Sequence, residues 1–149
     1  MSLDLRELYQ EVIIDHNRNP RNHYEMLDAT TYANGFNPLC GDKLTLFLKI
    51  EHDRVIESSF KGCGCAISQA SASLMTDSIK GQSIAEVRKL FDAFYTMMTQ
   101  ETDLPAKTLD KLTVLMGVKA YPARVKCATL AWHTLDAALN KSIKTITTE

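Results

Sequence analysis

Four cysteines and one aspartate are the residues of this chain best suited to bind a metal ion or to handle sulfur. Cys63 and Cys65 lie two residues apart among glycines, Cys40 is followed closely by Asp42, and Cys127 comes late in the chain. Thiolates and a carboxylate can together hold a soft or borderline metal ion, or handle sulfur. The sequence Cys40-Gly41-Asp42 places both ligand-type side chains on one side of an extended segment, because side chains alternate along a strand.

Cys65 directly precedes a helix-like run that begins at Ala66. A thiol at a helix N-terminus faces unpaired amide N–H groups and the positive end of the helix dipole, so its thiolate form is favoured. We therefore predict a single metal centre with Cys40, Asp42, Cys65 and Cys127 as ligands. Three thiolates and one carboxylate suit tetrahedral Zn²⁺, and they could also hold an iron–sulfur cluster.

Composition narrows the class of protein. The chain has 149 residues, a 45% share of hydrophobic residues and a formal net charge of −1. These values fit one domain over residues 1–149 and give no support for nucleic-acid binding. No apolar run approaches the ~18 residues of a membrane span, and the first residues lack the pattern of a signal peptide. We expect a cytoplasmic protein with reduced cysteines and no membrane partner.

The elements that must position these residues follow from periodicity. Apolar spacing predicts a helix from about Ser2 that stops near Pro20, and alternation predicts strands over Leu44–Ile50 and Val55–Phe60. A weaker strand is expected over 29–33, followed by turns at Asn34-Gly35 and Asn37-Pro38. Residues 145–149 are expected to fray.

Four further helices are expected after the central cysteines. The first spans 66–80, and the second starts with the capping box Ser83–Glu86. The third is a short helix that ends at Gly117, and the last begins at Pro122. The fold class is therefore α+β, a small three-stranded antiparallel sheet with helices packed on one face. His16 is interpreted as a helix-end residue that bonds backbone carbonyls, and His133 as a surface residue.

Four stretches carry a family resemblance. Asp15–Asn22, Asn37–Asp42, Gly62–Ser71 and Arg124–Trp132 resemble the iron–sulfur cluster assembly proteins of the NifU N-terminal/IscU class, including its fold. Within that class the chain is similar to the SufU branch. Tyr121–Val125 replaces the Leu-Pro-Pro-Val-Lys chaperone-binding stretch of IscU-type proteins, Lys126 replaces their His, and the segment 98–120 is longer.

The resemblance implies tightly bound zinc and a SufS-type cysteine desulfurase that passes persulfide sulfur to this protein. The cluster would then be built on a SufB/SufC/SufD-type (SufBCD) complex. Cys40 is the expected sulfur acceptor and the expected catalytic residue of a sulfurtransferase, because its turn-like segment between Pro38 and Gly41 can swing outward.

Three alternatives stay open at this point. The residues could form a scaffold that assembles a [2Fe–2S] cluster with transient iron, or a structural zinc domain that only binds partners. Two cysteines, Cys63 and Cys65, are also alternatives for the third thiol ligand of the centre. Aligned to the IscU pattern Cys63 would be the ligand, whereas the SufU pattern and the helix terminus both favour Cys65.

Overall fold

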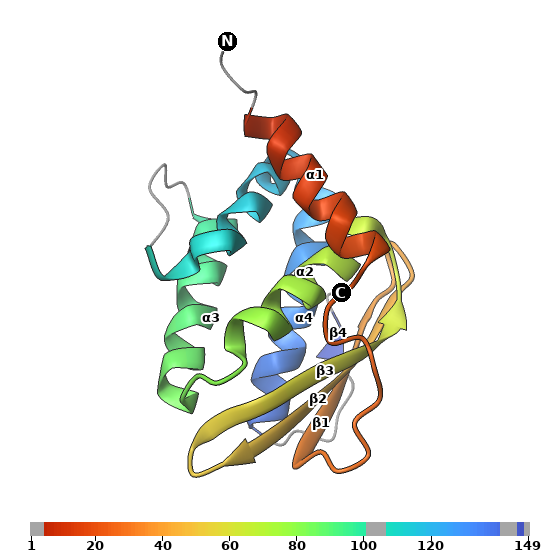
Figure 1. The fold of residues 1–149 in the computed structure, drawn as a ribbon. Coiled ribbons are helices and arrows are strands. Elements are labelled where there is room, and N and C mark those ends of the chain that lie inside the picture. Colours follow the sequence, from red (N-terminus) through yellow and green to blue (C-terminus); the bar gives the residue numbers. More distant parts are fainter. Residues whose placement is uncertain (1–4, 101–106, 141–145, 148–149) are drawn as a thin grey trace.

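A computed structural model describes residues 5–100, 107–140 and 146–147. The chain order of the main elements in it is α1 (Leu5–Arg18), β1 (Thr31–Asn37), β2 (Asp42–Glu51), β3 (Arg54–Cys63), α2 (Ala66–Ile79), α3 (Ile84–Thr99), the 3₁₀ segment η1 (Lys107–Ala120), α4 (Pro122–Leu139) and β4 (Ile146–Thr147). Figure 1 shows the helices gathered on one side and the sheet on the other. The expected α+β class is confirmed.

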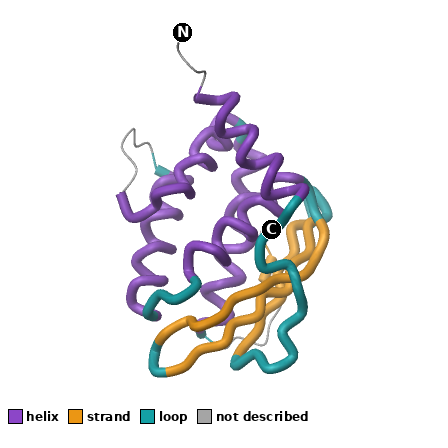
Figure 2. The backbone as a smooth tube through the Cα atoms, viewed as in Figure 1, coloured by secondary structure: helices purple, strands orange, loops and turns teal. Residues whose placement is uncertain are grey.

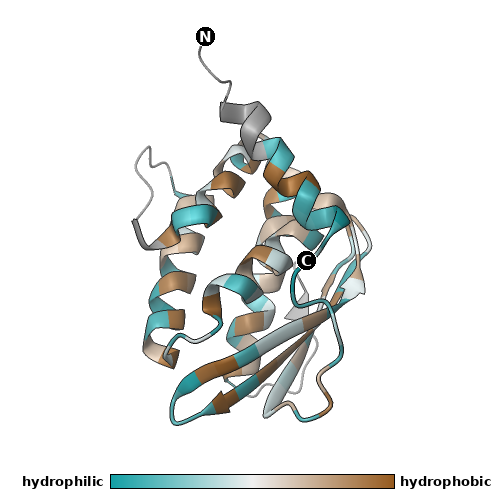
Figure 3. Cartoon of the chain, in the orientation of Figure 1, coloured by the Kyte–Doolittle hydropathy of each residue, from teal (hydrophilic) through white to brown (hydrophobic). Residues whose placement is uncertain are grey.

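β1, β2 and β3 form an antiparallel meander. β4 adds to the sheet beside β1, so the strand order is β3-β2-β1-β4. Along β2, Leu44, Leu46 and Leu48 are buried on the helix side, and the residues between them lie on the outer face. Figure 3 colours the chain by hydropathy and shows hydrophobic and hydrophilic residues both present along the sheet. The tight turn between β2 and β3 has positive φ at His52 and Asp53.

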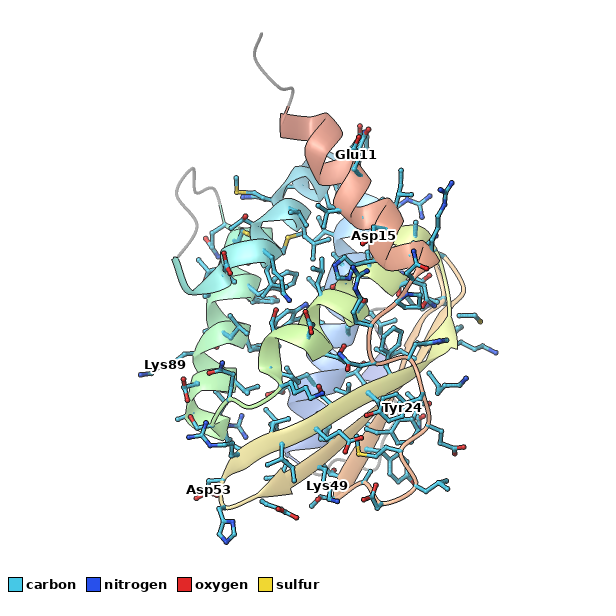
Figure 4. The ribbon with its side chains drawn as sticks, viewed as in Figure 1. Glu11, Asp15, Tyr24, Lys49, Asp53 and Lys89 are labelled. Atoms are coloured by element: carbon cyan, nitrogen blue, oxygen red, sulfur yellow. The ribbon has the colours of Figure 1, made fainter. Side chains whose placement is uncertain are left out.

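The sheet is covered on its inner face by α2 and α4. Trp132 of α4 stacks on Phe94 of α3 with ring centroids 4.3 Å apart, and both side chains are almost completely buried. The loop from α1 to β1 runs along the sheet (Figure 2). Tyr24 of this loop donates a hydrogen bond to Glu57, and Asp28 pairs with Lys49 at 2.7 Å; Tyr24 and Lys49 are labelled in Figure 4.

Several expectations on local structure were wrong. The first strand covers 31–37 rather than 29–33, so Asn34-Gly35 lies inside it and forms no turn. Gly35 is needed there because an added Cβ would come within 2.1 Å of Thr134 Oγ1 on α4. Within the stretch expected to fray, the two described residues Ile146 and Thr147 pair in parallel with Gly35 and Phe36.

The remaining two differences concern the segment before the last helix and His133. The short helix does not end at Gly117; it is a 3₁₀ segment to Ala120 with a kink at Asp110. His133 is not a free surface residue, because its ring packs edge-on against Phe91 and Tyr95. The expected helix start at Ser2 and the polar connection over 101–106 lie outside the described residues. The capping box of α3 and Pro122 at the start of α4 are both present as expected.

Candidate metal centre

The candidate centre lies at one end of the sheet, where three segments of the chain meet. Asp42 is the first residue of β2, Cys40 precedes it in a turn, and Cys127 lies in the second turn of α4. Their ligand-type atoms all lie within 4.8 Å of one another. Gly41 between the first two has φ 70°, a left-handed conformation that glycine adopts without strain. The turn therefore brings Cys40 back over Asp42.

Asp42 is completely buried, and its carboxylate is held on both oxygens. Oδ1 accepts a hydrogen bond from the backbone N–H of Cys65 at 2.8 Å, and Oδ2 accepts one from Asn37 Nδ2 at 3.0 Å. A buried carboxylate without such partners would be costly, because burial in a medium of low dielectric constant disfavours the charged form. The side chain is thus oriented before any metal arrives.

Cys65 is the N-cap residue of α2, as the sequence predicted. Its backbone reaches Asp42, but its sulfur is not part of the group of atoms within 4.8 Å that the described residues form. Gly64 allows this close approach, because a Cβ at that position would lie 2.6 Å from Asp42 Oδ1. The half-buried thiol of Cys65 stands at the rim of the site, at the N-terminus of α2.

Cys63 lies differently from Cys65. It is the last residue of β3, it is exposed, and it pairs in register with Lys43 of β2. Lys43 is one residue after the inward-facing Asp42 and is exposed, so this register position belongs to the outer face of the sheet. Strand geometry therefore separates Cys63 from the side of the sheet on which Asp42 lies.

The two clustered thiols interact directly. Cys127 donates to the sulfur of Cys40 at 3.2 Å, and the Arg124 guanidinium donates to the same sulfur at 3.0 Å. Burial, followed by the hydrogen bond to Cys40 and the charge of Cys65, raises the pKa of Cys127 well above its usual range. A metal ion that binds both sulfurs must displace this shared proton, so metal uptake would release protons.

The position of Cys127 depends on how α4 packs on α2. Ser71 of α2 donates to the carbonyl oxygen of Ala128 at 2.6 Å and accepts a hydrogen bond from Trp132 Nε1 at 3.2 Å. All three residues are buried, so these hydrogen bonds form in a low-dielectric environment where leaving them unmade would be expensive. The contact locks the turn of α4 that carries Cys127.

The histidines stay outside this centre. His16 is 7% exposed, and its Nδ1 lies 2.7 Å from Ser73 Oγ, a hydroxyl that also accepts the backbone N–H of Arg21. The expectation that His16 bonds backbone carbonyls was therefore wrong; it ties the end of α1 to α2. Asp15, next to it at the end of α1, pairs with Arg21 and is labelled in Figure 4.

Sequence reasoning missed Asn37 as part of the centre. The pair Asn37-Pro38 indicated a turn, whereas Asn37 is the buried last residue of β1 and contacts both Asp42 and Cys127. The side chain of Asn37 points toward the helices because of where β1 begins, since alternate residues of a strand face opposite sides of the sheet. A strand predicted over 31–37 with alternating burial would have placed it on the helix side.

Comparisons with known proteins agree with this geometry. The family described as NifU-like N terminal domain matches residues 8–128. The zinc-dependent sulfurtransferase SufU of Bacillus subtilis is 40% identical over 138 residues, which cover 93% of each chain. The iron–sulfur cluster assembly scaffold protein IscU of Thermotoga maritima is 42% identical over 134 residues, 90% of this chain and 94% of the relative.

A solved structure is also similar. The crystal structure of an iron–sulfur cluster assembly scaffold protein for the SUF system from Fervidobacterium islandicum AW-1 superposes with a TM-score of 0.83 at 34% identity, covering 90% of this chain and 98% of that one. Within the described ranges, no helix is long and apolar enough to cross a membrane. The chain belongs to the NifU-like N-terminal domain family.

Proposed function

We propose that this protein acts in iron–sulfur cluster assembly as a zinc-dependent sulfur acceptor, with one Zn²⁺ held by Cys40, Asp42, Cys65 and Cys127. The observation that carries the proposal is the convergence of two thiols and one buried carboxylate, from three separate segments, within 4.8 Å. We further propose that residues 1–149 act as one domain, since a continuous buried core joins the sheet to the helices.

The donor set fits zinc. Zinc in proteins takes four ligands in a tetrahedron, with Zn–S bonds of about 2.3 Å that put two sulfurs about 3.8 Å apart. The sulfurs of Cys40 and Cys127 are 3.2 Å apart, so they need to separate only slightly. The half-buried Cys65 would supply the fourth ligand by turning its thiol from the rim toward Asp42. A bound Zn²⁺ supplies one thing to the chemistry: it keeps the ligand thiols deprotonated at neutral pH.

Cys40 is the residue best suited to accept sulfur. It lies in a turn rather than in a helix, it is half-buried rather than buried, and Arg124 beside it can balance the charge of a thiolate. In the transfer, the Cys40 thiolate attacks the outer sulfur of a persulfide on the donor protein. The S–S bond of the donor breaks, its cysteine leaves as a thiolate, and Cys40 carries the persulfide.

The donor we propose is a cysteine desulfurase of the SufS type, and the recipient a SufBCD-type scaffold. The name of the B. subtilis relative, a zinc-dependent sulfurtransferase, supports the first step. We propose a cytoplasmic location, because four free cysteines, two of them 3.2 Å apart, need a reducing compartment to stay unpaired.

A second candidate function is a scaffold that builds a [2Fe–2S] cluster on the same residues. The T. maritima relative is named an assembly scaffold, which favours this alternative. The same ligand set would hold iron in place of zinc, although one carboxylate makes it less suited to a cluster than four thiolates would be.

One experiment separates the two functions. The protein is incubated with a cysteine desulfurase and cysteine, thiols are alkylated, and its peptides are analysed by mass spectrometry. A sulfur acceptor should gain sulfur on the Cys40 peptide and stimulate desulfurase turnover, while Cys40→Ser should lose both effects and Cys63→Ser neither. Added sulfur on Cys63 alone would reject Cys40. With iron present, a stable cluster that transfers to an apo-ferredoxin would establish the scaffold instead.

A further inference from the structure

We propose that Asn37 is a positioning residue of the metal centre, one that holds Asp42 and Cys127 in the arrangement they need to share a metal ion. The inference rests on the proposed function, since it assigns Asn37 a part in the centre of Cys40, Asp42, Cys65 and Cys127. Asn37 itself is not assigned as a ligand.

The contacts of Asn37 reach three segments of the centre. Its Nδ2 donates to Asp42 Oδ2 at 3.0 Å and to Cys127 Sγ at 3.4 Å, and its Oδ1 accepts the backbone N–H of Leu39 at 3.3 Å. The first contact fixes the carboxylate, the second fixes the thiol of α4, and the third fixes the chain directly before Cys40. One side chain therefore joins the three places from which clustered ligands come.

The orientation of this amide follows from its neighbours. With the amide rotated by half a turn, the oxygen would face the carboxylate of Asp42, and the N–H of Leu39 would meet an NH₂ group. Both contacts would be repulsive, and Asn37 is completely buried, so water could not relieve them. The donor side of the amide must face the two ligand groups.

The sheet register explains why Asn37 can do this. Asn37 is the last residue of β1 and pairs directly with Asp42, the first residue of β2. Directly opposed residues of an antiparallel pair have neighbouring side chains on the same face. Asn34, three residues earlier, lies exposed on the outer face, where it accepts a hydrogen bond from Thr45. Two asparagines of one strand thus differ in their distance from the centre while sharing their chemistry.

An amide is suited to this position because it is neutral and presents two N–H donors. It can stabilise a carboxylate and a thiolate without competing with a cation for them, which a lysine or arginine would do. Partners that orient metal ligands from behind typically change metal affinity 10- to 100-fold when they are removed. We expect an effect of about this size for the loss of the Asn37 amide.

The test uses the full chain and compares Asn37→Ala and Asn37→Leu with the matched control Asn34→Ala. Leucine keeps the branched shape of asparagine without its donors, so it guards against a simple packing defect at a buried site. Zinc affinity is measured by competition with a chromophoric chelator, and the ligand geometry by the visible absorption of bound Co²⁺. Circular dichroism and the melting temperature of the zinc-free proteins report on folding.

The inference predicts that both Asn37 variants bind zinc about 10- to 100-fold more weakly and shift the Co²⁺ bands, while Asn34→Ala matches the wild type. A variant that is destabilised but binds zinc normally, with unchanged Co²⁺ bands, would overturn it, because Asn37 would then serve only the fold. A wild type that binds no zinc would overturn the metal centre together with this inference. Normal zinc binding in the wild type and in both Asn37 variants would overturn the inference alone.

Discussion

At the scale of single residues, the centre depends on how closely its neighbours approach Asp42. The backbone N–H of Cys65 and the amide of Asn37 hold its two oxygens, and Gly64 packs against its side chain without a Cβ. Each approach leaves the carboxylate little freedom to rotate. In the proposed metal centre, these contacts would orient the carboxylate before a metal ion binds.

Gly64→Ala should displace this carboxylate. The new Cβ would come 2.6 Å from Asp42 Oδ1 and 3.1 Å from Asp42 Cβ, and one of these groups must move. We expect zinc affinity to fall about 10-fold or more, as for other changes that disturb ligand orientation. Gly117→Ala, which meets nothing within 4 Å, is the matched control and should bind zinc normally. Equal affinities in a chelator competition would contradict the assigned role of Gly64.

Residue types and spacing predicted part of this centre. The two clustered cysteines and Asp42 could be named because few residue types hold metals and Cys40-Gly41-Asp42 is short. Asn37 could not, because the local preference of Asn-Pro for turns indicated a loop. Its buried position depends on the pairing of β1 with β2, a long-range interaction that no short stretch contains.

At the scale of elements, the helices were more predictable than the first strand. The capping box that starts α3 uses residues three positions apart, and it formed as expected. β1 depends instead on α4, because Gly35 faces Thr134 and Leu130 of that helix. The turn preference of Asn34-Gly35 is a local effect, and it is outweighed by strand pairing and helix packing.

Gly35→Ala should therefore loosen the contact between β1 and α4. An added Cβ would overlap Thr134 Oγ1, and overpacking of a core typically costs about 1–3 kcal/mol of unfolding free energy. Urea unfolding should show this loss. Thr134→Ala removes the nearest atom, so the double variant should recover part of it. A Gly35→Ala protein as stable as the wild type, or no recovery in the double variant, would contradict the packing described here.

At the scale of the whole molecule, two histidines outside the cluster of ligand-type atoms connect helices. His16 ties α1 to α2 through Ser73, and His133 packs between α4 and α3 against Phe91 and Tyr95. Burial lowers the pKa of both imidazoles below 6.5, and for His16 the Arg21 guanidinium lowers it further. Both rings are therefore favoured in the neutral form in the folded protein.

Because the pKa of each histidine is lower in the folded protein than in the unfolded chain, we predict a loss of stability in mild acid. As the pH falls through 6.5, the unfolded chain binds protons at these histidines before the folded protein does, so the free energy of unfolding decreases. His16→Gln and His133→Gln should each flatten that decrease between about pH 7 and about pH 5, and the double variant should flatten it most. Urea unfolding of the zinc-free proteins measures the slope; a His16→Gln protein with the wild-type slope would contradict the burial argument.

We propose a metal centre of Cys40, Asp42, Cys65 and Cys127. The assignment most open to disproof is that of Cys65 as the third thiol ligand. Native mass spectrometry of the wild type, Cys65→Ser and Cys63→Ser proteins counts zinc per chain directly. We predict one zinc in the wild type and in Cys63→Ser, because Cys63 lies at an outward register position of β3, and a marked loss of zinc in Cys65→Ser. Zinc retained by Cys65→Ser and lost by Cys63→Ser would contradict this ligand set.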